Sequence, residues 1–267
     1  MQFIKLKSGS SIPILGLGTW KLKGSKCKSV VEDALNLGYL HIDTADLYEN
    51  HKSVGEAIKS ISREKIFLTS KIWFNNLDNP KPVVSRFLKE LDTPYLDLLL
   101  IHWPDSSQSM VKAFSELQEL KKEGLVKNLG VSNFSISHLK NLVDADLVPD
   151  VNQVEFHPLL YQKDLLSFCK KYNIILTAYS PFGHAKILSN SVLKEIAKSY
   201  NKSVAQICLA WLFEKEIVAI PKASSIEHLN QNLDSLNFNL LKEDIERIDS
   251  LNENLRTCNP SFAEFDE

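Results

Sequence analysis

Short apolar runs alternate with longer amphipathic segments along most of this chain. Residues 1–18 alternate apolar and polar positions and then turn, which predicts a β-hairpin at the start. Eight apolar runs have the character of strands buried in a parallel sheet: 14–17, 39–42, 66–69, 96–101, 126–131, 151–154, 174–178 and 217–220. Helical spacing follows them at 25–37, 54–60, 82–91, 110–122, 136–143, 164–171, 192–200, 203–213, 226–236 and 244–251.

This order of elements predicts a (β/α)8 TIM barrel in the α/β class. Alternating strands and helices require a parallel sheet, and roughly 250 residues is the usual size of such a barrel. An open doubly wound sheet is the main rival, but its glycine-rich turn is incomplete here, because Gly16-Leu17-Gly18-Thr19-Trp20-Lys21 lacks a third glycine. We expect residues 1–267 to form a single barrel domain with an N-terminal hairpin and a C-terminal helix.

Particular residues predict where helices begin and end. Ser25 and Ser135 precede apolar-periodic segments and are candidate N-caps, and Pro80 is compatible with a first helical turn. After the last helix, residues 252–267 are polar apart from Phe262 and Phe265. We expect this segment to wrap the barrel and to bury both phenylalanines.

Composition narrows the classes of partner. Hydrophobic residues make up 44% of the chain, charged residues 24%, and the net charge is -2, so the protein should fold around a large core and have no general attraction to nucleic acid or membranes. No apolar run reaches the roughly 18 residues of a membrane span. Cys27, Cys169, Cys208 and Cys258 form no CxxC pair, and no secretory leader is evident. We therefore expect a cytoplasmic protein, monomeric or weakly self-associating.

Polar residues follow the predicted strands from the second to the eighth. In barrel enzymes this end of the sheet carries the active site. In chain order these residues are Asp43 (with Tyr48 in the loop beyond), Lys71, His102, Ser132 and Asn133, Gln153, Tyr179 and Ser180, and Lys222. Some polar residues are expected wherever strands meet solvent, but seven consecutive strands with this chemistry indicate a functional site.

Four of these residues suit the reduction of a carbonyl group. Tyrosine keeps its proton at neutral pH, and a nearby lysine such as Lys71 lowers its pKa. A carboxylate such as Asp43 would hold that lysine in place, and a neutral His102 could donate a hydrogen bond to the substrate oxygen. Tyr48 is thus a candidate general acid or base.

Each of the four also has an ordinary structural interpretation. Taken singly, Asp43 is more often a turn or cap residue, His102 is more often structural, and Tyr48 is most often a packing aromatic. A metal site made of Asp43, His102, Glu155 and His157 is a further alternative, although the two histidines lie two strands apart. We therefore predict no metal.

Seven segments resemble the aldo-keto reductase family, in the order in which that family carries them. They are HIDTADLYEN (41–50), SKIW (70–73), LLLIHWP (98–104), LGVSNF (129–134), NQVEFHP (152–158), AYSPFG (178–183) and AIPKASS (219–225). The resemblance extends from the hairpin to the final helix. It implies a nicotinamide-dependent carbonyl reductase, with Tyr48 as the acid in reduction, Asp43 and Lys71 tuning it, and His102 orienting the carbonyl.

The resemblance also implies a cofactor site and a substrate site. The residues implied to bind the cofactor are Thr19, Trp20, Asp43, Ser132, Asn133, Gln153, Tyr179, Ser180, Phe182, Ile220, Lys222, Ser224, His228, Gln231 and Asn232. Those implied to bind substrate are Trp20, Tyr48, Trp73, His102 and Trp103. For the three tryptophans, core packing is the better interpretation without the resemblance.

Departures from the family pattern bear on the choice of cofactor. His228 stands where the family often carries arginine, Gln231 where it often carries glutamate, and Ala223 where it usually carries serine. Lys222 remains as a point charge for a 2′-phosphate. We expect NADPH as cofactor, with weakened discrimination against NADH.

Short segments around the expected site indicate an open pocket. Residues 103–109 and the C-terminal segment are short, which the resemblance associates with permissive microbial reductases. Small aldehydes or α-dicarbonyls are the expected substrates, with keto sugars as further candidates. The alternatives are a cofactor-binding regulatory protein on the same scaffold and a metal-dependent barrel hydrolase.

Overall fold

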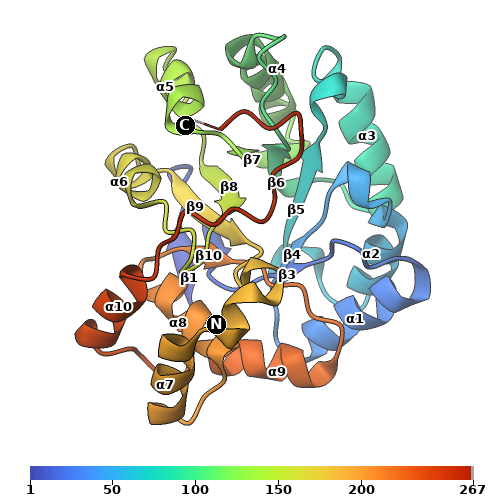
Figure 1. The fold of residues 1–267 in the computed structure, drawn as a ribbon. Coiled ribbons are helices and arrows are strands. Elements are labelled where there is room, and N and C mark those ends of the chain that lie inside the picture. Colours follow the sequence, from blue (N-terminus) through green and yellow to red (C-terminus); the bar gives the residue numbers. More distant parts are fainter. Residues whose placement is uncertain (266–267) are drawn as a thin grey trace.

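A sheet of eight parallel strands forms the centre of the molecule, whose computed structural model describes residues 1–265 (Figure 1). The strands are β3 (Leu17–Gly18), β4 (His41–Asp43), β5 (Phe67–Ile72), β6 (Leu96–Ile101), β7 (Val126–Ser132), β8 (Val151–Glu155), β9 (Ile175–Tyr179) and β10 (Val218–Ala219). Neighbours in sequence are neighbours in the sheet. The two ends meet where Leu15 bridges Ala219, whose N–H donates to the Ile14 carbonyl at 2.8 Å. The predicted (β/α)8 barrel is confirmed.

Helices surround the strands on the outside (Figure 1). They are α1 (Gly24–Asn36), α2 (His51–Ile58), α3 (Pro80–Leu91), α4 (Met110–Lys122), α5 (Ile136–Asp144), α6 (Lys163–Lys171), α7 (Ser191–Ser199), α8 (Val204–Glu214), α9 (Ile226–Asp234) and α10 (Lys242–Asp249). Four 3-10 segments lie in the connections: η1 (Asp46–Tyr48), η2 (Arg63–Lys65), η3 (Phe74–Asn76) and η4 (Gly183–Ser189). Sequence reasoning did not predict these 3-10 segments.

Alternating side chains along the strands fill two separate cores. In β6, Leu98 and Leu100 belong to a small cluster that also contains Leu6 and Ile12, whereas Leu99 and Ile101 belong to the large cluster beneath the helices. Successive strand residues point to opposite faces, so the small cluster fills the barrel interior. The hairpin of β1 (Phe3–Lys5) and β2 (Ser11–Pro13) contributes to this interior cluster and leaves the carboxyl ends of the strands open.

Helix boundaries follow the capping residues where a side chain makes the cap. Ser135 accepts from the backbone N–H of His138, as predicted, and Ser203 caps α8 in the same way from just outside the helix. The prediction for Ser25 is wrong, because α1 begins one residue earlier with Lys23 as an N-cap that makes no side-chain bond. A turn that ends with the Leu22 N–H donating to the Thr19 carbonyl brings the chain into the helix early.

The C-terminal tail, residues 252–265, crosses the carboxyl ends of the strands and ends beside α5 (Figure 1). It wraps the barrel as expected, but the burial expected for its phenylalanines is wrong. Phe262 is 43% exposed and Phe265 is half-buried. Both rings pack against Trp103 at the barrel mouth, and Phe262 lines a cavity there. Within residues 1–265, no helix is long and apolar enough to cross a membrane.

Candidate active site

Four polar residues meet at the carboxyl end of the barrel, and we call Asp43, Tyr48, Lys71 and His102 the tetrad. The Lys71 Nζ donates to Asp43 Oδ1 at 2.5 Å and to the Thr44 carbonyl at 3.0 Å. It also lies 3.4 Å from the Tyr48 hydroxyl oxygen. The rings of Tyr48 and His102 are 5.9 Å apart in an edge-on arrangement. The structure therefore brings together all four residues that the sequence proposed.

Neighbouring strands position three members of the tetrad. Asp43 ends β4, Lys71 lies next to the end of β5, and His102 follows β6 directly, with its N–H donating to the Ile72 carbonyl at 2.9 Å. Parallel strands in adjacent positions bring these side chains to one end of the sheet. Because strands are rigid supports, the mutual geometry of these three residues is fixed by the barrel itself.

Tyr48 lies in η1 and is positioned by the loop after β4. The buried Asn50 secures this loop, because its side-chain amide donates to the carbonyls of Thr19 and Leu22 at 3.1 and 3.0 Å, and its Oδ1 accepts from Thr44 Oγ1. Asn50 thus ties the loops after β3 and β4 together beneath Tyr48. Sequence reasoning missed this residue, and the only signal was its place in the segment that carries Tyr48.

Lys71 is a fully buried cation whose charge is balanced. Burial by itself lowers the pKa of the Lys71 ammonium, but the Asp43 carboxylate and Tyr48 outweigh burial and raise it above its usual value. The second oxygen of Asp43 accepts from Gln153 Nε2 at 2.8 Å, so both carboxylate oxygens are bonded. A positive charge is therefore held permanently beside the Tyr48 hydroxyl.

Tyr48 differs from the expectation in one respect. Burial raises the pKa of Tyr48, and the positive charge of Lys71 lowers it by a smaller amount, so the net direction is upward and not downward as predicted. Transferring a phenolate into a low-dielectric site costs more than one nearby ammonium recovers. Tyr48 consequently holds its proton in this structure and is suited to act as an acid.

His102 is neutral near pH 7, as expected. Burial and the positive charge of Lys71 lower the pKa of His102 well below its usual 6.5. Its ring also packs edge-on against Trp73, with ring centres 5.4 Å apart. A neutral imidazole carries one N–H, so it can donate a hydrogen bond to an oxygen placed beside Tyr48.

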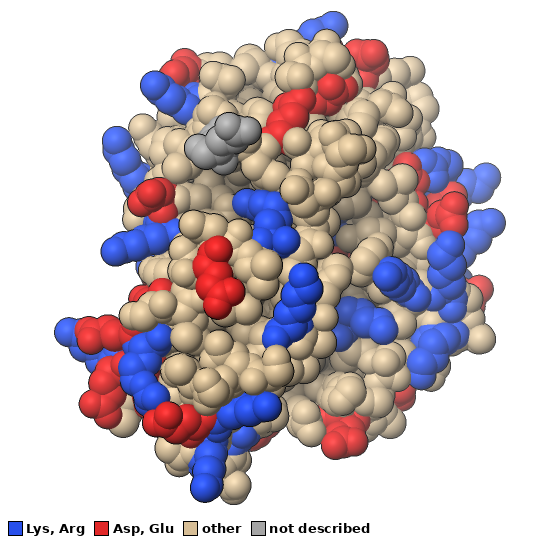
Figure 2. Space-filling view, in the orientation of Figure 1, with Lys and Arg blue, Asp and Glu red and all other residues tan. Residues whose placement is uncertain are grey.

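Three members of the tetrad, Asp43, Tyr48 and His102, line a cavity of about 790 Å³, and the buried Lys71 is bonded to two of them from behind its wall. Both signs of charge are interspersed over this face of the molecule, which is hollowed near its centre (Figure 2). The cavity is lined by Gly18, Trp20, Asp43, Leu47, Tyr48, Trp73, His102, Trp103, Ser132, Asn133, Gln153, Tyr179, Ser180, His184, Ile220, Lys222, Thr257, Cys258, Asn259, Pro260 and Phe262. A cleft of this size at this end of a barrel is the usual place of an active site.

Comparisons with known proteins agree with this geometry. The model of the Aldo/keto reductase family matches residues 14–253. The chain belongs to this family. It is similar to "Glyoxal reductase" of Bacillus subtilis (strain 168), at 40% identity over 95% of this chain and 94% of that protein. It is also similar to "Methylglyoxal reductase DkgA" of Escherichia coli (strain K12), at 36% identity over 95% and 94%.

A solved structure shows the same fold over the full length. The crystal structure of MGS-M4, an aldo-keto reductase enzyme from a Medee basin deep-sea metagenome library, matches with a TM-score of 0.93 and 39% identity, and all of both chains is covered. Family membership confirms the prediction that this chain is an oxidoreductase.

One side of the aldo/keto reductase cavity is aromatic. Trp20 is 45% exposed at the rim, Trp73 is half-buried and Trp103 is 6% exposed. All three were predicted to line this mouth, and all three do. Leu47 and Phe262, both more than one third exposed, complete the apolar side, and sequence reasoning did not place them there.

The opposite side carries the polar groups proposed for the cofactor. Asn133 donates to the His102 carbonyl at 3.0 Å and accepts from the Tyr179 hydroxyl at 2.8 Å, while Ser132 Oγ donates to the Gln153 carbonyl. Asn133 and Ser180 both have a positive φ, of 63° and 46°. Left-handed backbone at non-glycine residues is uncommon and clusters at functional sites.

The remaining residues proposed for the cofactor lie around or beyond this cavity. Ile220, Lys222 and Ser180 line it. The exposed Ser224 lies just before α9, whose N-cap is Ser225, and the exposed His228 lies in the first turn of that helix. The others, which do not line the cavity, are Thr19 with its hydroxyl on the Asp43 carbonyl, the half-buried Phe182, Gln231 bonded to Glu227, and the buried Asn232.

The alternative metal site has no support in the geometry. Within residues 1–265, no group of three or more His, Cys, Asp or Glu side chains is arranged to hold a metal ion. Asp43 is bonded to Lys71, whereas Glu155 accepts from His157 and from the tail. The carboxylates of Asp43 and Glu155 are therefore each bonded to other partners and not directed at a shared point.

Proposed function

We propose that this aldo/keto reductase is an NADPH-dependent carbonyl reductase acting on aldehydes, α-dicarbonyls or keto sugars. The observation that carries the proposal is the position of Lys71, which is bonded to Asp43 and lies next to the Tyr48 hydroxyl, while Asp43 and Tyr48 both line the cavity. Relatives named glyoxal, methylglyoxal and aldose reductases support it.

The tetrad would stabilise the oxygen of the carbonyl as charge develops on it. A bound NADPH supplies the hydride to the carbonyl carbon. The Tyr48 hydroxyl donates its proton to the oxygen, because its raised pKa keeps it protonated until the oxygen becomes basic. The N–H of the neutral His102 donates a second hydrogen bond to that oxygen.

Lys71 stabilises the negative charge that remains after this transfer. When Tyr48 has given up its proton, the phenolate lies next to a permanently charged ammonium. Asp43 prevents that ammonium from moving toward the phenolate and losing its other partners. The same arrangement lets Tyr48 act as the base when an alcohol is oxidised.

The residues present fit a dinucleotide phosphate. The cavity extends from the tetrad past Tyr179 and Ser180 to Lys222, and α9 begins four residues beyond Lys222. A lysine and a helix N-terminus both favour negative charge, as a 2′-phosphate requires. Ser132, Asn133 and Gln153 would bind the carboxamide at the other end, and Tyr179 would stack on the nicotinamide ring.

The direct test is the loss of NADPH absorbance in the presence of carbonyl compounds. We would use methylglyoxal, phenylglyoxal, benzaldehyde and a keto sugar, each with NADPH and with NADH. Turnover with at least one of them, faster with NADPH, is expected. An enzyme preparation that binds NADPH and reduces none of these carbonyls would overturn the proposal and favour a regulatory role.

A further inference from the structure

Glu155 is a buried carboxylate that takes no part in the proposed reaction. It is the last residue of β8, with 0% of its surface exposed, and it follows Gln153 by two residues on the same face of the strand. An unpaired carboxylate in such a position would be very unfavourable, because burial removes its hydration. The structure must therefore supply it with strong donors.

Three of the four donors to Glu155 come from the tail. The backbone N–H of Thr257 lies 3.0 Å from both carboxylate oxygens, that of Cys258 lies 2.9 Å from Oε2, and the Thr257 hydroxyl donates to Oε1. The fourth donor is His157 Nε2, at 3.1 Å. The tail residues lie about 100 positions further along the chain, so Glu155 joins the end of a barrel strand to a segment without regular structure.

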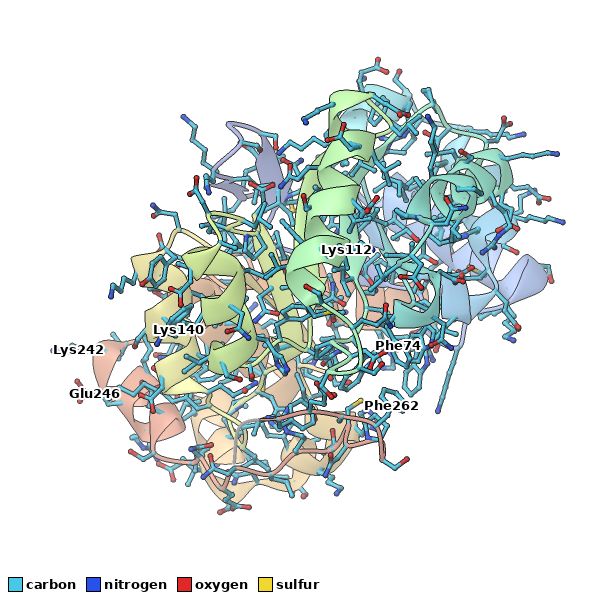
Figure 3. The ribbon with its side chains drawn as sticks, turned by 90° about the horizontal axis from the view of Figure 1, so that it is seen from above. Phe74, Lys112, Lys140, Lys242, Glu246 and Phe262 are labelled. Atoms are coloured by element: carbon cyan, nitrogen blue, oxygen red, sulfur yellow. The ribbon has the colours of Figure 1, made fainter. Side chains whose placement is uncertain are left out.

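The segment held by Glu155 continues directly into the wall of the cavity. Cys258, Asn259, Pro260 and Phe262 all line the cavity that Tyr48 and His102 also line. The Phe262 ring packs edge-on against Trp73 at 5.5 Å and Trp103 at 5.4 Å. Figure 3 shows Phe262 beside Phe74, and their ring centres are 5.9 Å apart.

A second attachment of the tail lies nearer to the surface. Glu264 accepts from the Ser106 N–H at 2.9 Å and from His138 Nε2 at 3.2 Å. These groups are partly exposed, and solvent weakens such contacts. The attachment at Glu155 lies two residues before Pro260, and the attachment at Glu264 lies two residues after Phe262. Of the two, only the attachment at Glu155 uses a carboxylate that is fully shielded from water.

We infer that Glu155 is a positioning residue for the substrate: it holds the tail so that Phe262 forms one wall of an apolar subsite for the substituent of the carbonyl compound. This inference rests on the proposed function and adds a substrate class to it. Trp20, Trp73, Trp103 and Phe262 offer ring faces and edges, whereas the cationic side chain lining the cavity, Lys222, lies toward α9. The subsite therefore favours neutral carbonyl compounds that carry an aryl group, such as aryl glyoxals.

The kinetic test compares phenylglyoxal with methylglyoxal in Glu155→Gln, Phe262→Ala and the double variant. The neutral amide that replaces the carboxylate cannot accept from four donors, so the tail should loosen. For phenylglyoxal we expect KM to rise about 3- to 10-fold in each single variant, the size of a lost aromatic contact, with kcat nearly unchanged. Methylglyoxal, which has no ring to place, should show a smaller rise in KM.

The double variant distinguishes positioning from an independent effect. If Glu155 acts through the tail, adding E155Q to F262A should raise the KM for phenylglyoxal no further than F262A alone does. Multiplicative effects would overturn the inference, and so would an equal rise for both substrates or a change confined to kcat. Should E155Q fail to fold, Thr257→Val removes one donor from the tail, and the same pattern is expected with smaller shifts.

Amide hydrogen exchange tests the attachment without using activity. The N–H groups of Thr257 and Cys258 should exchange at least about 10-fold faster in E155Q than in the wild-type protein. The matched control is Glu264→Gln, which loosens the outer attachment and should leave these two amides protected. Unchanged exchange in E155Q would overturn the anchoring role even if the enzyme reduces carbonyls. A wild-type protein that reduces none would overturn the substrate class together with the proposed function, but not the anchoring role.

Discussion

The tetrad and the tail are built in different ways, although they form two sides of one cavity. Lys71, Asp43 and His102 are fixed by adjacent strands and bonded mostly to neighbours within the barrel. The tail has no helix or strand from residue 252 to residue 265, and it is held through a few side chains such as Glu155 and His138. The difference separates two tasks of the site. The proposed chemistry depends on residues held rigidly by the barrel strands, whereas the choice of substrate depends on the attached tail.

The largest expected effect is on the tetrad, through Tyr48→Phe. Removing the hydroxyl removes the proposed proton donor, so kcat/KM for methylglyoxal should fall about 10²- to 10⁴-fold. NADPH affinity, measured by titration of protein fluorescence, should stay the same, because the hydroxyl is bonded to Lys71 and not to the polar side of the cavity. Retained turnover in this variant would show that another group supplies the proton.

Asp43→Asn should reveal how strongly the stability of the barrel depends on the buried charge pair of Asp43 and Lys71. The variant leaves the Lys71 ammonium buried with no carboxylate partner, so the free energy of unfolding should fall by about 3–5 kcal/mol, as measured by urea denaturation. Without Asp43, burial lowers the pKa of Lys71, and activity should be lost as pH rises through that lower value.

A matched double variant separates charge from packing at this position. Asp43→Asn combined with Lys71→Met removes both charges, and stability should recover toward that of the wild-type protein while activity stays low. If the single and the double variant lose the same free energy of unfolding, the loss comes from the changed shape of the side chain and not from the unpaired ammonium.

Acid pH should weaken the attachment of the tail at Glu155. The Glu155 carboxylate accepts from His157, Thr257 and Cys258, and these bonds lower its pKa to about 2 although burial opposes them. Because the folded pKa lies below the unfolded value of 4.5, the stabilisation is complete above about pH 4.5 and is lost as pH falls toward 2. The shift corresponds to a contribution of roughly 3 kcal/mol.

The comparison of wild type with E155Q isolates this titration. The difference between their free energies of unfolding should be largest near pH 6 and shrink as pH falls, because a protonated Glu155 resembles glutamine. The charged or titratable groups that face Glu155 are His157, Arg256, Cys258 and Tyr179, and all of them remain in both proteins. A difference that stays constant with pH would mean that Glu155 stabilises the tail by packing alone.

Sequence patterns predicted the barrel better than the tail for a physical reason. The barrel repeats one local unit, so the apolar runs and caps such as Ser135 report directly on it, and polar residues after the strands must gather at one end. The tail has no such period. Its contacts join Thr257 to Glu155 and Phe262 to Trp73, and no local signal links residues so far apart.

Two expectations failed because they needed the environment of a side chain. The sequence placed Lys71 beside Tyr48 and so predicted a lowered pKa, but the cost of burying the phenolate is larger and could not be judged without the fold. Likewise, Phe262 was expected to be buried because it is aromatic, whereas it is 43% exposed at a cavity wall.

The smallest expected effect is at a third region, the exposed start of α9. Neither the tetrad nor the tail is expected to determine the affinity for NADPH there. His228→Arg adds a guanidinium in the first turn of that helix, six residues after Lys222. At an exposed site a new ion pair contributes little, so the dissociation constant of NADPH should fall no more than about 5-fold, and that of NADH should not change. The gain in affinity for NADPH should diminish in high salt.

Asn230→Arg adds the same charge to an exposed position of the same helix and serves as the matched control. Equal gains from the two variants would indicate a general field at α9, and a gain for NADH would argue against a 2′-phosphate site beside Lys222.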